Sequence, residues 1–243
     1  TEDTGPATIG IPNHALNYVE SMFKSNNVPI PEVLNPSGKV GIPLAGTEVK
    51  VLDDGELCIK GKHVAKGYYK LDNETKETFD SDGWLHTGDL AEIDDNGYVK
   101  IVGRKKEILI TSGGKNIAPV EIEDHVKPHT LVGQICVAGD GKKFLSALIV
   151  LDGDGGAEKW AEENGVAYNI SDMSKNSKVI DAIQGQIDEA NSKVARVQQI
   201  KKFTLLENEW TDSSGELTPT LKLKRNVIAE RYKNEIESMY EEA

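Results

Sequence analysis

Two turn sequences, each between residues that suit β-strands, constrain the first half of this chain most strongly. Residues 48–60 run through Asp53-Asp54-Gly55 with apolar and polar residues alternating on both sides, and residues 90–102 turn back around Asp94-Asp95-Asn96-Gly97. Alternation of period two predicts a half-buried strand, and a glycine-containing turn between two such stretches predicts an antiparallel hairpin. Residues 38–102 are therefore expected to form a small β-rich, barrel-like unit.

The second half mixes strands with helices. Apolar residues 131–138 and 144–151 flank Gly139-Asp140-Gly141, which predicts two strands joined by a turn, and residues 200–206 predict a third strand. Helices are expected over residues 16–23, 73–79, 120–126, 157–164, 178–193 and 225–240. This order predicts an α+β fold, with a separate domain at 105–243 made of a three-stranded sheet and flanking helices.

Charge and hydropathy argue against two classes of partner. The 243 residues carry 28 Lys and Arg against 40 Asp and Glu, a formal net charge of −12. Such a chain repels nucleic-acid backbones, although a local basic pocket for one phosphorylated ligand is compatible with it. The longest apolar run, 144–151, is far shorter than the roughly 20 residues of a transmembrane helix. Cys58 and Cys136 lie in apolar runs without metal-ligand companions, which indicates buried thiols and a cytoplasmic location.

Asp89 lies in the segment GWLHTGDL at residues 83–90, after a Thr-Gly turn and before an apolar strand. A short carboxylate beside a glycine turn can accept hydrogen bonds from both hydroxyls of a ribose. Aspartate in a loop more often caps its own turn, and the residue taken alone favours that structural interpretation. His86 in the same segment favours a packing role, because no catalytic Ser/His/Asp or Cys/His arrangement accompanies it.

Three further segments invite a functional interpretation beside a structural one. Arg104, Lys105 and Lys106 form a basic triplet that suits either phosphate contact or a solvated strand end. The segment SGGKN at 112–116 suits either close approach of a ligand or a plain strand-to-helix connection, and it lacks Walker-loop spacing. Lys222 lies in LTPTLKLKR at 217–225, before the last helix. Cations near a helix N-terminus cost roughly 0.3–1 kcal/mol, which slightly favours a function for this lysine.

In this order, the segments resemble the adenylate-forming superfamily, which includes acyl-CoA synthetases, firefly luciferase and the adenylation domains of peptide synthetases. TE at 1–2 resembles the end of that family's Tyr-Gly-x-Thr-Glu motif, and GWLHTGDL resembles its Thr-Gly-Asp motif. GRKKE at 103–107 with SGGKN is similar to its hinge and following loop. LTPTLKLKR is similar to its C-terminal lysine motif, in the form found in long-chain fatty acyl-CoA synthetases. The resemblance spans the chain and is weakest over residues 11–37.

The resemblance implies roles in the formation of an acyl adenylate from a fatty acid and ATP. Asp89 would bind the ribose hydroxyls of ATP or AMP, and Arg104 would contact ribose or phosphate. Thr1 would lie near the nucleotide phosphate, and Glu2 would help to hold Mg²⁺. Lys222 would be the catalytic lysine, since two anions must approach each other and cations must neutralise the transition state.

The resemblance also implies a second half-reaction, in which the thiol of coenzyme A attacks the acyl adenylate. Gly113, Gly114 and Lys115 would border the channel for the pantetheine arm of CoA. Lys106 would be the hinge about which residues 105–243 rotate, withdrawing Lys222 and presenting the glycine loop. Residues 1–104 would then be the C-terminal end of the large AMP-binding domain.

The family's upstream Gly-rich phosphate loop ending in Pro-Lys-Gly is absent from this sequence, and residue 1 is not methionine. We expect the C-terminal portion of a long-chain fatty acyl-CoA synthetase, inactive without the missing N-terminal domain of its parent. Peripheral contact of such an enzyme with a membrane is compatible with its hydrophobic substrates. Two alternatives stay open: a non-catalytic binding or regulatory module with the same fold, and an adenylation domain that loads a carrier protein.

Overall fold

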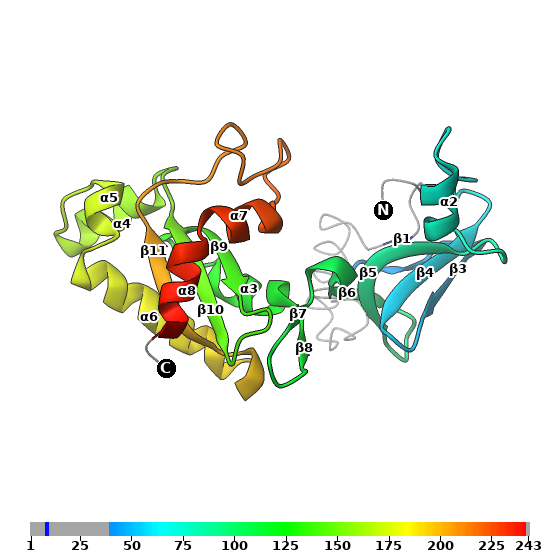
Figure 1. The fold of residues 1–243 in the computed structure, drawn as a ribbon, viewed down its shortest axis with the longest axis horizontal. Helices are drawn as coiled ribbons and strands as arrows, with labels where there is room; N and C mark the ends of the chain where they lie inside the picture. The colour runs from blue at the N-terminus through cyan, green and yellow to red at the C-terminus, as the bar shows by residue number, and fades with distance from the viewer. Residues whose placement is uncertain (1–7, 10–38, 242–243) are drawn as a thin grey trace, which may run out of the picture. The chain divides into compact units, whose positions relative to one another are not determined.

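The structure, a computed structural model, describes residues 8–9 and 39–241 (Figure 1). Thr1, Glu2 and the helix expected over residues 16–23 lie outside the described residues. Contacts divide the chain into two compact units, Thr1–Lys106 and Glu107–Ala243.

The first unit is built on a curled antiparallel sheet with the strand order β3-β4-β5-β6 (Figure 1). Its strands are β3 (Thr47–Val51), β4 (Glu56–Gly61), β5 (Leu85–Ile93) and β6 (Val99–Arg104). Both expected hairpins are confirmed, because β3 pairs with β4 and β5 pairs with β6 across the predicted turns. Helix α2 (Asp72–Thr78) forms where it was expected, and β1 (Thr8–Ile9) pairs with β2 (Ile42–Pro43).

Strand β5 differs from the expectation in where it begins. The sequence placed the strand start at Leu90, after a Thr-Gly turn, whereas β5 already begins at Leu85 and continues through that turn. Gly88 takes a φ of 70°, and the register with β4 shifts between Glu56 and Cys58. The strand therefore continues through a glycine in the left-handed region by shifting its register with β4. A residue with a Cβ at this position would be strained.

The second unit has a three-stranded sheet with helices on both faces. The strands are β9 (Val132–Ala138), β10 (Leu145–Leu151) and β11 (Ile200–Leu206), with β10 central, antiparallel to β9 and parallel to β11. The helices are α3 (Pro119–Val126), α4 (Gly156–Asn164), α5 (Ile170–Met173), α6 (Ser177–Ser192), α7 (Arg225–Arg231) and α8 (Lys233–Glu241). This arrangement confirms the α+β class.

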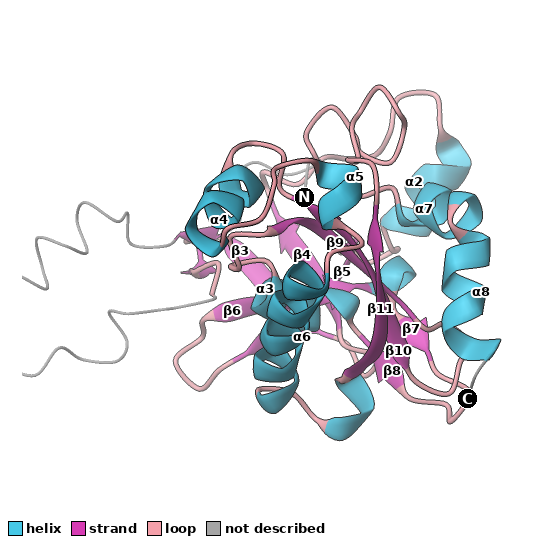
Figure 2. Ribbon diagram, turned by 90° about the vertical axis from the view of Figure 1, so that its left-hand side faces the viewer, coloured by secondary structure: helices cyan, strands magenta, loops and turns pink. Residues whose placement is uncertain are grey.

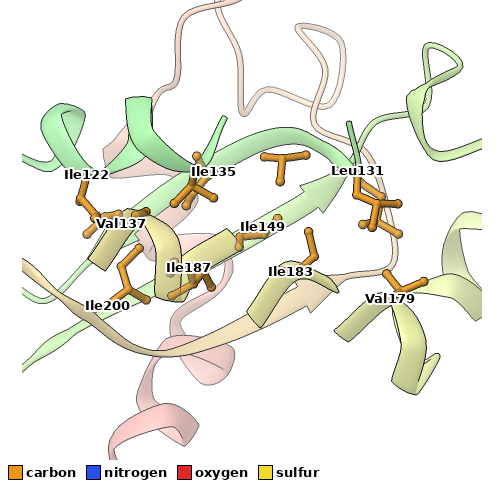
Figure 3. Close-up of a cluster of buried hydrophobic side chains, with 14 of the residues drawn as sticks. Ile122, Leu131, Ile135, Val137, Ile149, Val179, Ile183, Ile187 and Ile200 are labelled. Atoms are coloured by element: carbon orange, nitrogen blue, oxygen red, sulfur yellow. The ribbon is translucent and has the colours of Figure 1, made fainter. Parts of the chain in front are cut away.

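All seven residues of β10 are buried, because both faces of this central strand are covered. On one face Ile149 packs in a cluster with Ile122 of α3 and Ile183 of α6 (Figure 3). On the other face Leu148 belongs to a second cluster with residues of α7 and α8, among them Ile228. Figure 2 shows α3 and α6 on one side of the sheet and α8 on the other.

The C-terminal helix differs from the sequence expectation. One helix was expected over residues 225–240, but α7 ends before Tyr232 and α8 begins after it. Tyr232 leaves the helical region with φ −104° and ψ 29°, its ring lies 6.0 Å from that of Trp210, and its hydroxyl donates to Glu216. Over the described ranges, no helix has the length and apolar character needed to cross a bilayer.

Candidate functional site

The curled sheet of the first unit brings Asp89 and Arg104 together. The two residues are direct partners in the β5–β6 register, and Arg104 Nε lies 3.1 Å from Asp89 Oδ1. The Asp89 side chain is 14% exposed and that of Arg104 is 57% exposed, so the carboxylate is held while the guanidinium reaches solvent. The pair thus offers acceptor oxygens for a diol next to a planar cationic donor suited to phosphate.

Thr87 and Gly88 fix the backbone that carries Asp89. The Thr87 hydroxyl donates a hydrogen bond of 2.7 Å to the carbonyl of Leu57 on β4 and accepts one of 3.1 Å from the Asp89 amide. The Gly88 amide donates to Glu56 Oε1 at 3.0 Å. Backbone and side-chain bonds therefore set the direction of Asp89 before any ligand binds.

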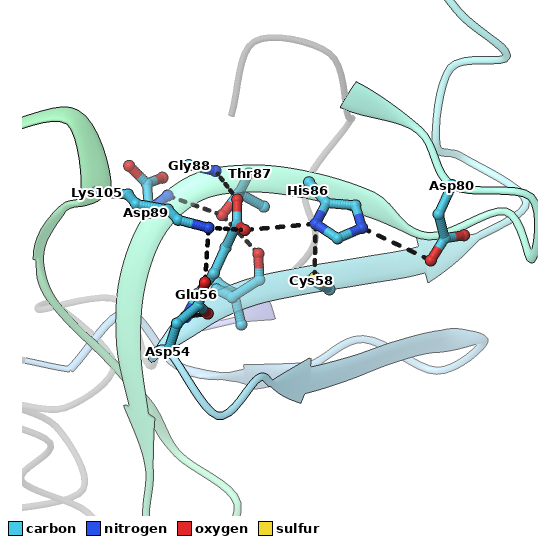
Figure 4. Close-up of polar contacts among 10 residues, drawn as sticks. Asp54, Glu56, Cys58, Asp80, His86, Thr87, Gly88, Asp89 and Lys105 are labelled. Atoms are coloured by element: carbon cyan, nitrogen blue, oxygen red, sulfur yellow. Dashed lines mark hydrogen bonds and ion pairs between the residues drawn. The ribbon is translucent and has the colours of Figure 1, made fainter. Parts of the chain in front are cut away.

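Glu56, which the sequence did not single out, lies at the centre of these contacts (Figure 4). Its side chain is only 7% exposed, and its Oε2 lies 2.9 Å from Lys105 Nζ and 3.4 Å from His86 Nδ1. Lys105 also pairs with Asp54 at 2.7 Å. A buried carboxylate needs hydrogen-bond donors or cations to compensate its charge, and Glu56 finds them in the Gly88 amide and the Lys105 ammonium group. Glu56 thereby connects the Thr-Gly-Asp segment to the basic triplet.

The ionisation of this cluster follows from its partners. Burial raises the pKa of Glu56, but hydrogen bonds from Lys105, the Gly88 amide and His86 outweigh burial and hold the pKa below the ordinary value of 4.5. Hydrogen bonds to Asp54 and Glu56 raise the pKa of Lys105 above its ordinary value. Glu56 and Lys105 are therefore both charged at neutral pH.

His86 lies between two acids and a thiol, on the strand that carries Asp89. Its Nε2 is 3.6 Å from Asp80 Oδ2, and its Nδ1, which faces Glu56, is also 3.7 Å from Cys58 Sγ. Cys58 is fully buried, and burial raises its pKa to about 11. These contacts connect His86 to the sheet and to the turn at Asp80.

The expected hinge and glycine loop form two local structures. Lys106 is exposed within one turn of 3-10 helix, Lys105–Glu107. Gly113, Gly114 and Lys115 are exposed in the loop of a short hairpin between β7 (Leu109–Ile110) and β8 (Asn116–Ile117). Gly114 has a φ of 73°, and its amide donates to the carbonyl of Thr111 at 2.8 Å, which closes the turn.

Lys222 is exposed at the end of a tight loop in the second unit. Leu217 and Leu223 form a β-bridge at the base of the loop. Inside it, the Lys222 carbonyl accepts from the Thr218 amide at 2.8 Å and the Lys222 amide donates to Thr218 Oγ1 at 3.0 Å. Leu221 has a φ of 59°, a left-handed conformation that costs a non-glycine residue roughly 1–2 kcal/mol. The loop therefore holds the backbone of Lys222 while leaving its side chain free to reach a ligand.

The implied metal site cannot be built from the described residues. Among residues 8–9 and 39–241, no group of three His, Cys, Asp or Glu side chains is placed to hold a metal ion. Glu2, the residue that the resemblance implies for Mg²⁺, lies outside these ranges, as does Thr1.

Curated relatives are ligases of long-chain fatty acids. The chain is 40% identical over 205 residues to "Long-chain-fatty-acid--CoA ligase FadD15" of Mycobacterium tuberculosis, which covers 84% of this chain and 34% of that protein. It is 39% identical over 207 residues to "Long-chain-fatty-acid--CoA ligase ACSBG2" of Gallus gallus, covering 78% of this chain and 27% of the relative. The chain thus spans about a third of the length of the relatives it matches.

Solved structures share the fold. The adenylation domain of a carboxylic acid reductase from Segniliparus rugosus, in complex with AMP and a carboxylic acid, matches with a TM-score of 0.63 at 24% identity over 83% of this chain and 32% of that one. ATP-bound MatB from Rhodopseudomonas palustris matches with a TM-score of 0.56 at 28% identity over 81% and 36%. Residues 106–243, more than half of the chain, match the family described as the AMP-binding enzyme C-terminal domain. The chain therefore belongs to the AMP-binding enzymes.

Proposed function

We propose that this chain is the C-terminal portion of an ATP-dependent, AMP-forming long-chain fatty acyl-CoA synthetase. In the first half-reaction the fatty acid carboxylate attacks the α-phosphate of ATP and displaces diphosphate. In the second, the CoA thiol attacks the acyl carbon and AMP leaves. The observation that carries the proposal is the Asp89–Arg104 pair, fixed on adjacent strands of a chain whose curated relatives are named as such ligases.

Nucleotide binding is assigned to the first unit. The Asp89 carboxylate accepts hydrogen bonds from the ribose hydroxyls, and Arg104 adds positive charge beside the ribose and phosphate. Glu56 supports both, because it bonds the Gly88 amide next to Asp89 and holds Lys105 next to Arg104. By the same resemblance, Thr1 would contact the nucleotide phosphates and Glu2 would help to hold Mg²⁺, which neutralises phosphate charge when it is bound.

Adenylation is assigned to Lys222. Its ammonium group neutralises charge where the carboxylate and α-phosphate approach each other, which lowers the barrier between two anions. The exposed lysine on a closed loop suits this role, because the loop fixes the backbone and the side chain spans the remaining distance.

Thioester formation is assigned to the glycine loop. Rotation about Lys106 withdraws Lys222 after adenylation and presents Gly113, Gly114 and Lys115 to the pantetheine arm of CoA. Small exposed residues in this loop leave room for a ligand chain. The proposal requires an N-terminal domain with the acyl pocket, and the 243-residue chain alone is not expected to release diphosphate from ATP and a fatty acid.

Two features bear on where the enzyme works. Both cysteines are free and buried, which suits a reducing compartment, and we place the protein in the cytoplasm on that ground. Long-chain fatty acids partition into membranes, so peripheral contact of the enzyme with a lipid surface is part of the proposal. The names of the relatives do not favour an adenylation domain that loads a carrier protein.

The test uses the longer parent protein that carries these residues and measures the two half-reactions separately. Lys222→Ala is expected to slow adenylation by roughly 10²–10³-fold, the scale for removing one preorganised charge, and to spare thioester formation from supplied acyl adenylate. Lys201→Ala, which removes an exposed lysine of β11, is the matched control. Unchanged adenylation in Lys222→Ala would contradict the role assigned to this lysine, and equal loss in both steps would show that its role is structural. Absence of both half-reactions in the wild-type parent would overturn the proposal and favour a binding module.

A further inference from the structure

One buried charge cluster of the second unit has no part in the chemistry assigned above. The guanidinium of Arg225, at the start of α7, bonds both oxygens of Glu123 on α3, with N–O distances of 2.7 Å for each. Its Nε donates to Glu107 Oε2 at 2.9 Å. We call these three residues the Arg225 cluster.

The Arg225 cluster is held rigidly. The Glu123 side chain is 1% exposed and that of Arg225 is 16% exposed. Glu123 Oε1 also accepts the Val137 amide of β9 at 2.8 Å, so the carboxylate is anchored to the sheet. A two-bond pair between planar groups fixes orientation as well as distance. Burying such charges carries a desolvation penalty, which the paired hydrogen bonds and the Val137 amide offset.

Two residues of the Arg225 cluster lie next to segments that the proposed function uses, the hinge and the Lys222 loop. Glu107 directly follows the hinge residue Lys106 in the sequence, and Arg225 lies three positions after Lys222. The bridge between Leu217 and Leu223 closes the Lys222 loop just before Arg225. Two connections therefore link Lys222 to the first residue after the hinge: the closed loop that ends just before Arg225, and the ion pair between Arg225 and Glu107.

We propose that Arg225 is a positioning residue that joins the residue after the hinge to the Lys222 loop, so that hinge rotation carries Lys222 as part of one rigid body. This inference rests on the proposed function. If the connection is lost, the loop reaches more positions, and adenylation suffers because a charge displaced by about 1 Å loses much of its effect. Thioester formation, in which Lys222 is withdrawn, is spared.

Glu107→Gln is the sharpest test. Replacing Arg225 or Glu123 leaves a buried charge unpaired and risks unfolding, whereas Glu107 is 33% exposed and its loss leaves the Arg225–Glu123 pair intact. Glu237→Gln is the matched control. It removes another distant ion pair of the same unit, 2.6 Å to Lys142, from a carboxylate that is 43% exposed.

Two readouts separate this inference from the proposed function. Hydrogen exchange of residues 217–224 is measured on the 243-residue chain and does not depend on catalysis. Glu107→Gln is expected to speed this exchange by up to roughly tenfold, because Arg225 Nε keeps at most a neutral acceptor in place of a charged one, while Glu237→Gln leaves it unchanged. In the parent enzyme, Glu107→Gln is expected to slow adenylation by a similar factor and to leave thioester formation within about twofold of wild type.

The outcomes are distinct. Unchanged exchange in the Lys222 loop overturns the coupling, whatever the activity. Equal loss of both half-reactions, together with faster exchange throughout the second unit, overturns it as well, because it shows general destabilisation. If Lys222→Ala does not impair adenylation, the proposed function fails, and the exchange experiment still decides whether Glu107 and the loop are coupled.

Discussion

Asp89 and Arg104 face each other across β5 and β6, with Arg104 Nε 3.1 Å from Asp89 Oδ1. Their contact follows from strand register, since direct partners on neighbouring antiparallel strands have adjacent side chains. The guanidinium restrains a carboxylate that Thr87 and Gly88 already orient through the backbone. A change at Asp89 therefore affects both a ligand contact and the position of Arg104.

Asp89→Ala is expected to raise the KM for ATP by roughly tenfold or more and to lower turnover in the parent enzyme, because charge-assisted hydrogen bonds to the ribose are lost. Steady-state kinetics with varied ATP measure this effect. Asp95→Ala, which removes an exposed acid in the adjacent hairpin turn, is the control and is expected to have no effect. Unchanged nucleotide kinetics in Asp89→Ala would remove Asp89 from the site.

Glu56→Gln is expected to lower the free energy of unfolding by about 1–3 kcal/mol, because Lys105 loses a buried charged partner and the Gly88 amide a charged acceptor. Urea denaturation of the 243-residue chain, followed by a probe of the first unit such as Trp84, measures it. Glu48→Gln, an exposed glutamate on β3 of the same sheet, is the matched control. Equal stability of the two variants would show that Glu56 is not what connects these segments.

The same residue predicts a pH dependence. The pKa of Glu56 lies below its ordinary value of 4.5 in the folded chain, so its contribution is fully present above that pH and is lost as the pH falls through the lower, folded pKa. Wild type is therefore expected to lose more stability than Glu56→Gln between neutral and acidic pH. Denaturation curves at several pH values compare the two, and parallel losses would refute this assignment.

The glycine loop yields a prediction with an internal control. Gly114→Ala places a Cβ on a residue with φ 73° and is expected to cost about 1 kcal/mol, whereas Gly113 has ordinary backbone and Gly113→Ala is expected to be neutral for stability. Both are expected to slow thioester formation in the parent enzyme and to spare adenylation. If neither affects the thioester step, the loop does not border the CoA channel.

Neither cysteine is expected to react with a thiol reagent in the folded chain. Burial raises the pKa of Cys58 to about 11 and that of Cys136 to about 12, so little thiolate exists at neutral pH and access is blocked. Labelling with a thiol reagent at pH 7 is expected to be slow in buffer and fast in denaturant. Fast labelling of either thiol without denaturant would show local opening of its strand.

Residues 47–61 and β10 show how much of the fold local pattern predicts. Alternation around Asp54-Gly55 specified a hairpin, and the apolar run at 144–151, which only Ser146 interrupts, specified the strand β10. The helix expected over residues 120–126 is α3, which begins one residue earlier at Pro119, a residue without an amide proton to satisfy. These signals act between near neighbours, so one sequence suffices to detect them.

The sequence by itself determined which residues are candidates: Asp89, Arg104, the glycine loop and Lys222 all lie in recognisable local segments. Only the tertiary structure decided their partners. Glu56 meets Lys105 from 49 positions away, and Arg225 meets Glu123 from 102 positions away. Such pairs depend on strand register and on which helix covers which face, and neither charge carries a local signal for the other. The sequence marked Thr87-Gly88 as a turn before a strand, whereas pairing with β4 and the bonds of both residues to that strand keep β5 continuous through it.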